Sequence, residues 1–216
     1  MTDKQELGQL LKRYATKKGE IKSRLLHFES VGKMGGRQLF EELAFCILTP
    51  QSKAFSCDEA IRELKKRGLL HGGTVSDIRI VLSKKTRFHN KKAEYLVAAR
   101  EKFSKDAFRF LQALTFSGTE SDARQVLLKE VKGIGWKEAS HYLRNVGRGR
   151  TIAILDRHIL KNLVKHRAIG ALPKSLTPKR YLEIEKKMEK FCKKAGIPIS
   201  HLDLLFWAEE TGRVFK

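Results

Sequence analysis

Hydrophobic residues recur at helical spacing along most of this chain. Apolar residues that repeat every three or four positions fall on one face of a helix, so they predict amphipathic helices. Four stretches show the pattern clearly: Leu7, Leu10, Leu11 and Tyr14; Leu39, Phe40, Leu43, Ala44, Ile47 and Leu48; Ala93, Leu96, Val97 and Phe103; and Tyr181, Ile184, Met188 and Phe191. No Asn-Gly or Asp-Gly pair with alternating flanks indicates a β-hairpin. The pattern predicts an all-α protein of roughly ten helices.

Residues with known preferences for helix boundaries stand at the ends of several stretches. Thr177 followed by Pro178 is typical of an N-cap and a first helical position, and Asn90 precedes the stretch 91–103. Glycine-rich breaks occur at 32–36 and 147–149. These breaks suggest that the helices form two lobes.

Two glycines separated by one residue lie between two predicted helices. Gly133 and Gly135 allow backbone angles that other residues avoid, and they let another backbone come close. Apolar residues flank them at helical spacing, and Gly147 is placed to end the second helix in a left-handed conformation. The pattern predicts a hairpin between helices, whose free amides attract a phosphate without reading a base. A plain helix-helix corner is the alternative.

Two side chains able to do chemistry follow the hairpin. Lys137 falls in the first turn of the second helix, where the macrodipole and burial disfavour an ammonium ion, so its amine is a candidate nucleophile. The alternative is one more solvated cation among 45 Lys and Arg residues. Asp156 precedes the apolar pattern 159–164 and is typical of an N-cap. One carboxylate oxygen can cap a helix while the other stabilises a developing positive charge.

Composition indicates the kind of partner. The chain has 216 residues, 41% of them hydrophobic, which is enough for a real core. Its formal net charge of +21 predicts a polyanionic partner, and nucleic acid is the first candidate. No run of 18 apolar residues predicts a membrane span, and no basic-then-apolar segment opens the chain. We expect an intracellular, cytoplasmic protein that does not bind membranes.

Cysteine and histidine usage predicts neither a disulfide framework nor a metal site. Cys46, Cys57 and Cys192 lie far apart, form no Cys-x-x-Cys pair and are odd in number, so we interpret them as reduced packing residues. The seven histidines show no zinc-like spacing with these cysteines. We expect no metal and no cofactor.

The stretch Val131-Lys132-Gly133-Ile134-Gly135-Trp136-Lys137-Glu138-Ala139, with Asp156 following 19 residues after Lys137, resembles the signature of helix-hairpin-helix DNA glycosylases. The resemblance implies that the lysine attacks C1′ of a damaged nucleotide and forms a Schiff base, and that the aspartate assists departure of the base. It also implies a lobe over residues 37–149 that carries the hairpin, a second lobe formed by residues 1–36 and 150–216, and a cleft between them. The four clustered cysteines of the iron-sulfur branches are absent.

Further stretches resemble the type 2 branch of 8-oxoguanine DNA glycosylases over nearly the whole chain. They are 47–51, 87–93, 133–139 and 207–216. This resemblance implies a bifunctional enzyme that flips 8-oxoguanine out of double-stranded DNA, excises it and cleaves the strand by β-elimination. We expect it to act as a monomer.

The resemblance also assigns residues that contact the DNA. Lys216, the last residue, would help to distinguish the lesion from guanine; Phe88 and Trp207 would stack on the flipped base. Gln51 would enter the gap that this base leaves. The structural alternatives are a frayed tail for Lys216, core positions for both aromatic residues, and an ordinary loop residue for Gln51. Val214 and Phe215 beside the tail are apolar and suited to dock it.

Two polar segments near the end of the chain have structural interpretations. Ser200 and Asp203 are spaced as a capping box, which we favour over a contact of Asp203 with the base. The cationic stretch 186–194 is interpreted first as a solvated helix face.

Two other functions compete with excision of 8-oxoguanine. A noncatalytic helix-hairpin-helix module that grips phosphates explains the glycines and the charge, but it gives no reason for Lys137 with Asp156. The second alternative keeps the chemistry and changes the lesion, for instance to an oxidised pyrimidine. A hairpin lysine favours a bifunctional enzyme over a monofunctional one.

Overall fold

The computed structural model describes residues 3–103 and 108–216, in which the regular structure is entirely helical. Twelve helices occur in these ranges: α1 (Asp3–Lys33), α2 (Gly36–Leu48), α3 (Ala54–Lys66), α4 (Leu69–Gly72), α5 (Val75–Ser83), α6 (His89–Phe103), α7 (Phe108–Phe116), α8 (Glu120–Glu130), α9 (Trp136–Asn145), α10 (Arg157–Lys165), α11 (Pro178–Ala195) and α12 (Ile199–Thr211). The predicted all-α fold is confirmed, with two helices more than the rough expectation.

Local signals set most of the predicted helix ends. Thr177 caps α11, because its side chain accepts a hydrogen bond from the backbone N–H of Arg180, and Pro178 takes the first helical position. Gly147 has a φ of 80° just after α9, as the predicted left-handed end requires. Asn90 lies inside α6, which begins at His89, so the prediction that Asn90 precedes this helix is wrong.

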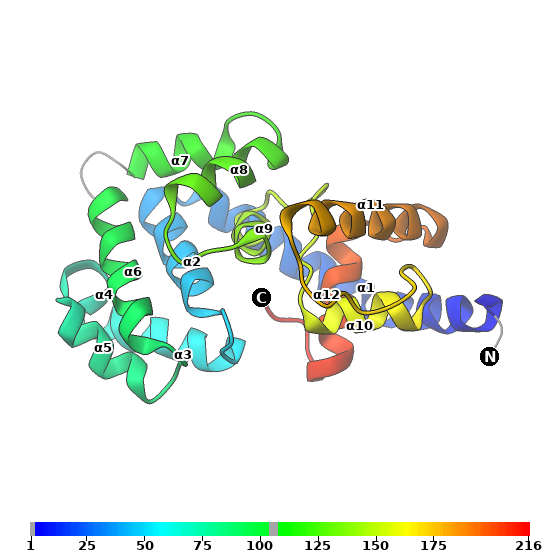
Figure 1. Cartoon of the computed structure of the whole chain (residues 1–216), viewed down its shortest axis with the longest axis horizontal. Helices are drawn as coiled ribbons and strands as arrows, with labels where there is room; N and C mark the ends of the chain where they lie inside the picture. The colour runs from blue at the N-terminus through cyan, green and yellow to red at the C-terminus, as the bar shows by residue number, and fades with distance from the viewer. Residues whose placement is uncertain (1–2, 104–107) are drawn as a thin grey trace.

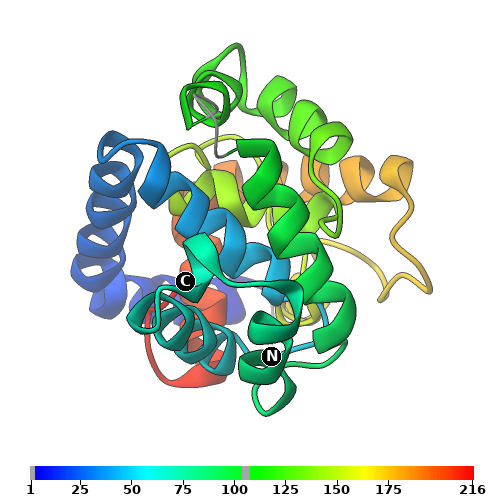
Figure 2. The ribbon, with the colours of Figure 1, turned by 90° about the vertical axis from the view of Figure 1, so that its left-hand side faces the viewer.

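The helices form two lobes, each around its own hydrophobic core. One core is built from α2 to α9 together with Val31 and Ile152; the other combines α1, residues 153–155 and α10 to α12. Figure 1 shows the first lobe on the left and α10 to α12 on the right, with α9 between them. In Figure 2, α2 runs through the middle of the first lobe, where it contacts α3, α6, α7 and α9. The lobe boundaries at 36/37 and 149/150 stay a prediction.

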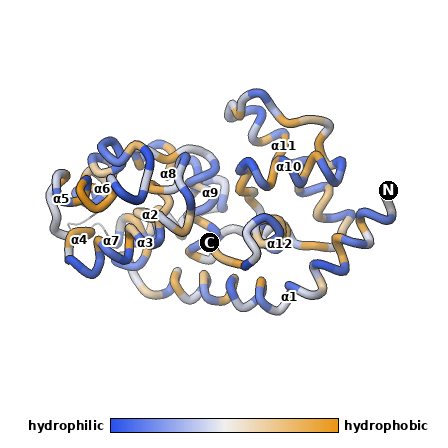
Figure 3. Tube along the Cα trace, turned by 90° about the horizontal axis from the view of Figure 1, so that it is seen from below, coloured by the Kyte–Doolittle hydropathy of each residue, from blue (hydrophilic) through white to orange (hydrophobic). Residues whose placement is uncertain are grey.

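The long helix α1 ties the two lobes together, because it contacts both α2 and α12. Figure 3 shows hydrophilic and hydrophobic residues alternating along α1. Near its end, α1 passes so close to α9 that a Cβ atom at Gly32 would lie 2.3 Å from the carbonyl oxygen of Val146. Only glycine fits at this crossing.

The tail after α12 returns to the space between the lobes, where the C-terminus lies in Figures 1 and 3. Val214 is buried, and its backbone N–H donates to Glu20 Oε1 at 3.2 Å. The Phe215 ring lies 4.7 Å from that of Phe55, measured between centroids. The predicted docking of the tail through Val214 and Phe215 is confirmed.

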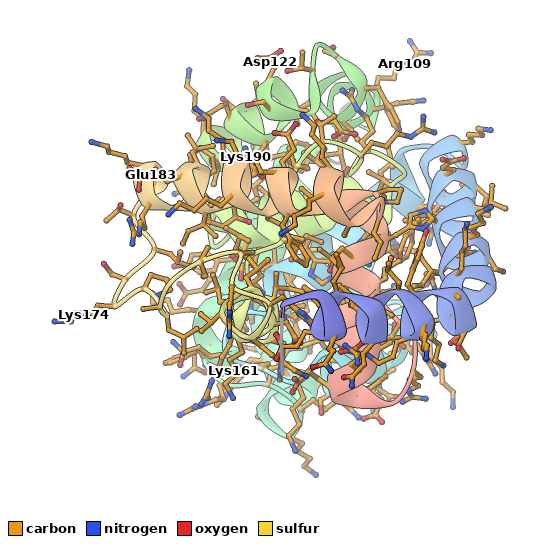
Figure 4. The ribbon with its side chains drawn as sticks, turned by 90° about the vertical axis from the view of Figure 1, so that its right-hand side faces the viewer. Arg109, Asp122, Lys161, Lys174, Glu183 and Lys190 are labelled. Atoms are coloured by element: carbon orange, nitrogen blue, oxygen red, sulfur yellow. The ribbon has the colours of Figure 1, made fainter. Side chains whose placement is uncertain are left out.

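Charged residues cover the outer faces of the helices. Figure 4 shows Lys190 and Glu183 pointing outward from α11, and the charged residues of the stretch 186–194 are exposed. The interpretation of this stretch as a solvated helix face is confirmed. Within the described residues, no helix is both long enough and apolar enough to cross a bilayer.

Candidate active site

A cavity of about 540 Å³ lies between the lobes. Its walls come from the loop after α2, the start of α3, α9, the segment that leads into α10, α12 and the C-terminal tail. The residues that line it are Thr49, Gln51, Ser52, Lys53, Ala54, Phe55, Lys137, His141, Arg144, Ile154, Asp156, Arg157, His158, Asp203, Trp207, Thr211 and Lys216. The structure therefore brings five of the predicted site residues into one cavity: Lys137, Asp156, Gln51, Trp207 and Lys216.

The hairpin fixes the start of α9 and so places Lys137. Gly133 has a φ of 86°, and a Cβ atom there would lie 2.2 Å from Cδ2 of Tyr95, so no larger residue fits without a rearrangement. Gly135 has an extended conformation and stands at the N-cap of α9. Neither glycine lines the cavity. Their contribution is to turn the chain so that Lys137, in the first turn of α9, faces the cavity.

The Lys137 side chain is 25% exposed and has two polar neighbours. Its Nζ lies 2.9 Å from Glu138 Oε1 and donates to Thr49 Oγ1 at 3.5 Å. The other oxygen of Glu138 accepts the backbone N–H of Gly135 at 3.1 Å, which closes the first turn of α9. The sequence interpretation missed Glu138, although an acid three residues into a predicted helix is a recognisable capping signal.

Asp156 both caps a helix and lines the cavity. It is the N-cap of α10, because Oδ1 accepts the backbone N–H of Ile159 at 2.8 Å, so the capping interpretation is confirmed. It also lines the same cavity as Lys137. The cap uses Oδ1, and a carboxylate has a second oxygen that can face a substrate.

Phe55 and Trp207 form an aromatic wall of the cavity. The ring of Trp207 lies 5.7 Å from that of Phe55 and 5.9 Å from that of Phe215. The Arg213 guanidinium lies over Phe55 at 3.8 Å. The alternative that Trp207 is only a core residue is wrong, because it lines the cavity. Phe55 was missed, since nothing in its local sequence distinguishes it from a packing residue.

Lys216 is anchored inside the first lobe. Its Nζ lies 2.7 Å from Glu42 Oε1 and 3.6 Å from Asp58 Oδ1, and it stands over the ring of Phe45 at 4.7 Å. The alternative of a frayed, solvated tail is therefore wrong. Because the tail starts from α12 and ends against α2 and α3, it also connects the two lobes beside the cavity.

The loop that carries Gln51 is held by a buried lysine. Gln51 has a left-handed φ of 53°, which is strained for a residue with a side chain. Lys92 is only 3% exposed and donates from Nζ to Leu48 O, Pro50 O and Ser52 Oγ at 2.7–2.8 Å. Burial lowers the pKa of this lysine to about 8. The three bonds fix the loop in a shape that Gln51 alone would not favour.

Phe88 is not brought to the cavity. It has a φ of 57°, it precedes α6, and its side chain is 57% exposed. It does not line the cavity, and the alternative that it is a core residue is wrong. Its stacking on a flipped base stays a prediction. The backbone N–H of the neighbouring Arg87 donates to Ser52 Oγ at 3.0 Å, so Phe88 lies close to the Gln51 loop on the outer surface.

Asp203 does not belong to a capping box, as the sequence had suggested, but lies in the cavity. Helix α12 begins at Ile199 with Pro198 at its cap, so Ser200 lies inside the helix and the predicted capping box does not form. Asp203 is instead 5% exposed, lines the cavity and lies 3.6 Å from Arg144 Nε. Burial raises the pKa of Asp203 to about 6; Arg144 opposes this shift and the charge of Asp156 adds to it.

A neutral histidine, His141, also lines the cavity. His141 on α9 is buried, and burial lowers its pKa well below the usual value, so its ring is uncharged at neutral pH. The ring packs edge-on against Phe45. His141 and Arg144 were missed, because one buried turn of helix α9 gives no local sign that it faces a cavity.

Among the described residues, no group of three or more His, Cys, Asp and Glu side chains is arranged to hold a metal ion. Cys46, Cys57 and Cys192 are buried and free, which confirms their interpretation as reduced packing residues.

Comparisons with known proteins agree on one family. The family described as 8-oxoguanine DNA glycosylase matches residues 21–197. A relative from Fusobacterium nucleatum, named 8-oxoguanine DNA glycosylase/AP lyase, is 43% identical over 221 residues, which cover 100% of both chains. The crystal structure of the 8-oxoguanine DNA glycosylase of Thermotoga maritima has a TM-score of 0.87 and 32% identity, and covers 100% of both chains.

A second similar structure is a complex with DNA. The Methanocaldococcus jannaschii 8-oxoguanine glycosylase/lyase, in complex with a 15mer DNA containing 8-oxoguanine, has a TM-score of 0.85 and 33% identity, and covers 96% of this chain and 100% of that chain.

We expect Asp203→Asn to change how stability depends on pH. The pKa of Asp203 is about 6 in the folded protein against a usual value of 3.8, so the folded state binds more protons in this window and loses stability as the pH rises through it. The variant lacks this titration. The unfolding free energy of the variant minus that of wild type should therefore rise by on the order of 1–3 kcal/mol as the pH increases from about 4 to about 7. Urea unfolding measures this difference, and a difference that is constant with pH would contradict the assignment.

Proposed function

The chain belongs to the 8-oxoguanine DNA glycosylase family, and from this premise we propose how its cavity excises 8-oxoguanine from DNA and then cleaves the strand as an AP lyase. The family resemblance of the hairpin and of the type 2 stretches is thereby confirmed. The observation that carries the proposal is that Lys137 and Asp156, which come from different helices, line one cavity together with an aromatic wall.

Asp156 is proposed to act in departure of the base. When the N-glycosidic bond breaks, its electron pair leaves with the base and positive charge develops on the sugar. A fixed carboxylate stabilises this charge most in the transition state, so it lowers the barrier rather than tightening substrate binding. The cap to Ile159 supports this role, because it holds the carboxylate in place before the DNA arrives.

Lys137 is proposed to be the nucleophile. An ammonium ion has no lone pair, so one proton must leave before the amine can attack; Glu138 Oε1, 2.9 Å from Nζ, is an available acceptor. The nitrogen then bonds to C1′, and opening of the sugar ring gives a protonated Schiff base. Loss of a proton from C2′ lets the 3′ phosphate leave, which breaks the strand. Water finally releases the lysine.

The aromatic wall and the tail are proposed to receive the flipped base. Trp207 offers a ring face at the cavity, and Phe55 supports it. Oxidised guanine carries a hydrogen on N7 where guanine has an acceptor, so a selective pocket presents an acceptor there. Lys216 stays the proposed discriminating residue: its ammonium group can only donate and is held by Glu42, so the acceptor it would present is a backbone oxygen. Phe88, whose exposed ring lies outside the cavity lining, stays a proposed stacking partner of the flipped base.

The chain binds DNA, and we propose that the strand passes over the Gln51 loop. A second hollow adjoins the cavity and shares Gln51, Ser52 and Lys53 with it. Four cations line this hollow: Lys53, Lys84, Lys85 and Arg87. They are suited to phosphates, while Gln51 is suited to fill the gap in the duplex and the amides near Gly133 and Gly135 to hold the backbone.

We further propose how many chains act together and where in the cell they act. One chain supplies every wall of the cavity, which supports action as a monomer on damaged double-stranded DNA. We also propose that the enzyme acts in the cytoplasm, and its DNA substrate supports this.

We expect Lys137→Gln to abolish covalent trapping. Borohydride reduces the Schiff base to a stable amine, so wild-type protein incubated with an 8-oxoguanine duplex should give an adduct on a denaturing gel. Lys132→Gln is the matched control, because Lys132 is an exposed lysine of the same hairpin and should leave trapping unchanged. Undiminished trapping in Lys137→Gln would show that another amine attacks.

We expect Asp156→Asn to slow excision on the order of 100-fold while DNA affinity changes by less than about threefold. An asparagine side chain can still cap the helix, so the substitution removes the charge and keeps the fold. Single-turnover rates and equilibrium binding to the same duplex measure the two effects. An equal loss in both would favour a purely structural role for Asp156.

A further inference from the structure

A buried ion pair between the two lobes lies outside the lining of the cavity. Arg124 on α8 is 1% exposed and does not line the cavity. Its two terminal nitrogens donate to both carboxylate oxygens of Glu185 on α11, at 2.6 and 2.8 Å. Such a two-pronged pair has a defined geometry as well as a favourable energy. The pair therefore fixes α8, in the hairpin, relative to α11, in the other lobe.

The same guanidinium group contacts the helix that carries Lys137. Arg124 Nη1 donates to Ser140 Oγ at 3.2 Å, and the guanidinium lies 4.8 Å from the centre of the Trp136 ring. Trp136 is the residue immediately before Lys137, and Ser140 lies one helical turn after it. Arg124 thus supports α9 on both sides of the proposed nucleophile.

On its other side, the network holds the segment that leads to Asp156. Residues 152–155 are buried and have no regular secondary structure, so their backbone groups need polar partners. Glu185 Oε1 accepts the N–H of Ala153 at 2.6 Å. The Tyr181 hydroxyl donates to the carbonyl of Ala153 at 2.7 Å and accepts the N–H of Leu155 at 3.1 Å. Asp156 follows directly.

We propose that Arg124, Glu185 and Tyr181 are positioning residues that set Asp156 relative to Lys137. This inference rests on the proposed roles of those two residues. One continuous set of contacts leads from the turn before Lys137, through a buried guanidinium and a buried carboxylate, to the backbone on which Asp156 stands. None of the three residues lines the cavity, so their effect on the reaction passes through geometry alone.

The two activities should respond differently when this network is loosened. Asp156 acts in base excision, whereas attack on an existing abasic site requires Lys137 but no departing base. Loss of the Tyr181 hydroxyl frees the segment 152–155, which leads to Asp156. It also removes a hydrogen bond to Ser140 on α9, but it leaves the Arg124 contacts to α9 in place. A misplacement on the ångström scale slows a reaction by about 10–100-fold.

The test uses Tyr181→Phe, which removes one hydroxyl and keeps the buried ring. Single-turnover excision of 8-oxoguanine should slow by about 10–100-fold, while borohydride trapping on a duplex with a preformed abasic site should stay within about threefold of wild type. Tyr142→Phe is the matched control. Tyr142 is also fully buried, and its hydroxyl bonds to Thr115 at 2.8 Å, with no link to Asp156 in these contacts, so both activities should persist.

Glu185→Gln provides a second variant, which decides the question if Tyr181→Phe does not fold. It keeps the shape of the side chain but presents an amide to one of the two Arg124 nitrogens. Because Arg124 also contacts α9, trapping on the abasic duplex should fall too, but excision, which needs Asp156 in addition, should fall by about tenfold more. Unchanged excision, or an equal fall of both activities, in a folded variant would overturn the proposal. Failure of the proposed function would appear separately, as wild-type protein that gives no trapped adduct on either duplex.

Discussion

The site depends on one guanidinium group that is almost completely removed from water. Arg124 and Glu185 come from helices that pack into different hydrophobic cores, so their ion pair links the two lobes between which the cavity lies. Burying two charges is costly, and removing one partner of such a pair typically destabilises a protein by about 3–5 kcal/mol, because the other charge stays buried. The geometry of the site and the stability of the fold are therefore linked at this point.

Charge is arranged differently at the surface and in the cavity. The chain carries a net charge of +21, and exposed cations around the Gln51 loop suit a polyanion. The cavity adds carboxylates to such cations: Asp156 and Asp203 line it together with Lys53, Lys137, Arg144, Arg157 and Lys216, and Glu138 supports Lys137 from its own helix. This mixture suits a reaction in which the phosphates need cations while the sugar, for a moment, needs an anion.

Short-range signals in the sequence predicted the parts of the fold that short-range physics controls. Thr177 with Pro178, Asp156 and Gly147 each satisfy or end a helix through atoms a few residues away, so their positions could be inferred from neighbours alone. Asp203 shows the limit of that reasoning: its spacing from Ser200 suits a capping box, but the preceding proline starts the helix two residues earlier. The cavity residues His141, Arg144 and Phe55 depend on how distant helices meet, and Phe88 matched the family pattern although its ring lies at the surface.

The central claim is that the amine of Lys137 forms the covalent bond with the sugar. Two competing amines are Lys92, whose pKa burial lowers to about 8, and Lys216, which lines the cavity. Peptide mapping by mass spectrometry of the borohydride-reduced wild-type adduct distinguishes the three. The account predicts that the sugar remnant is attached to the peptide that contains Lys137, at that residue. A remnant on Lys92 or Lys216 would contradict it.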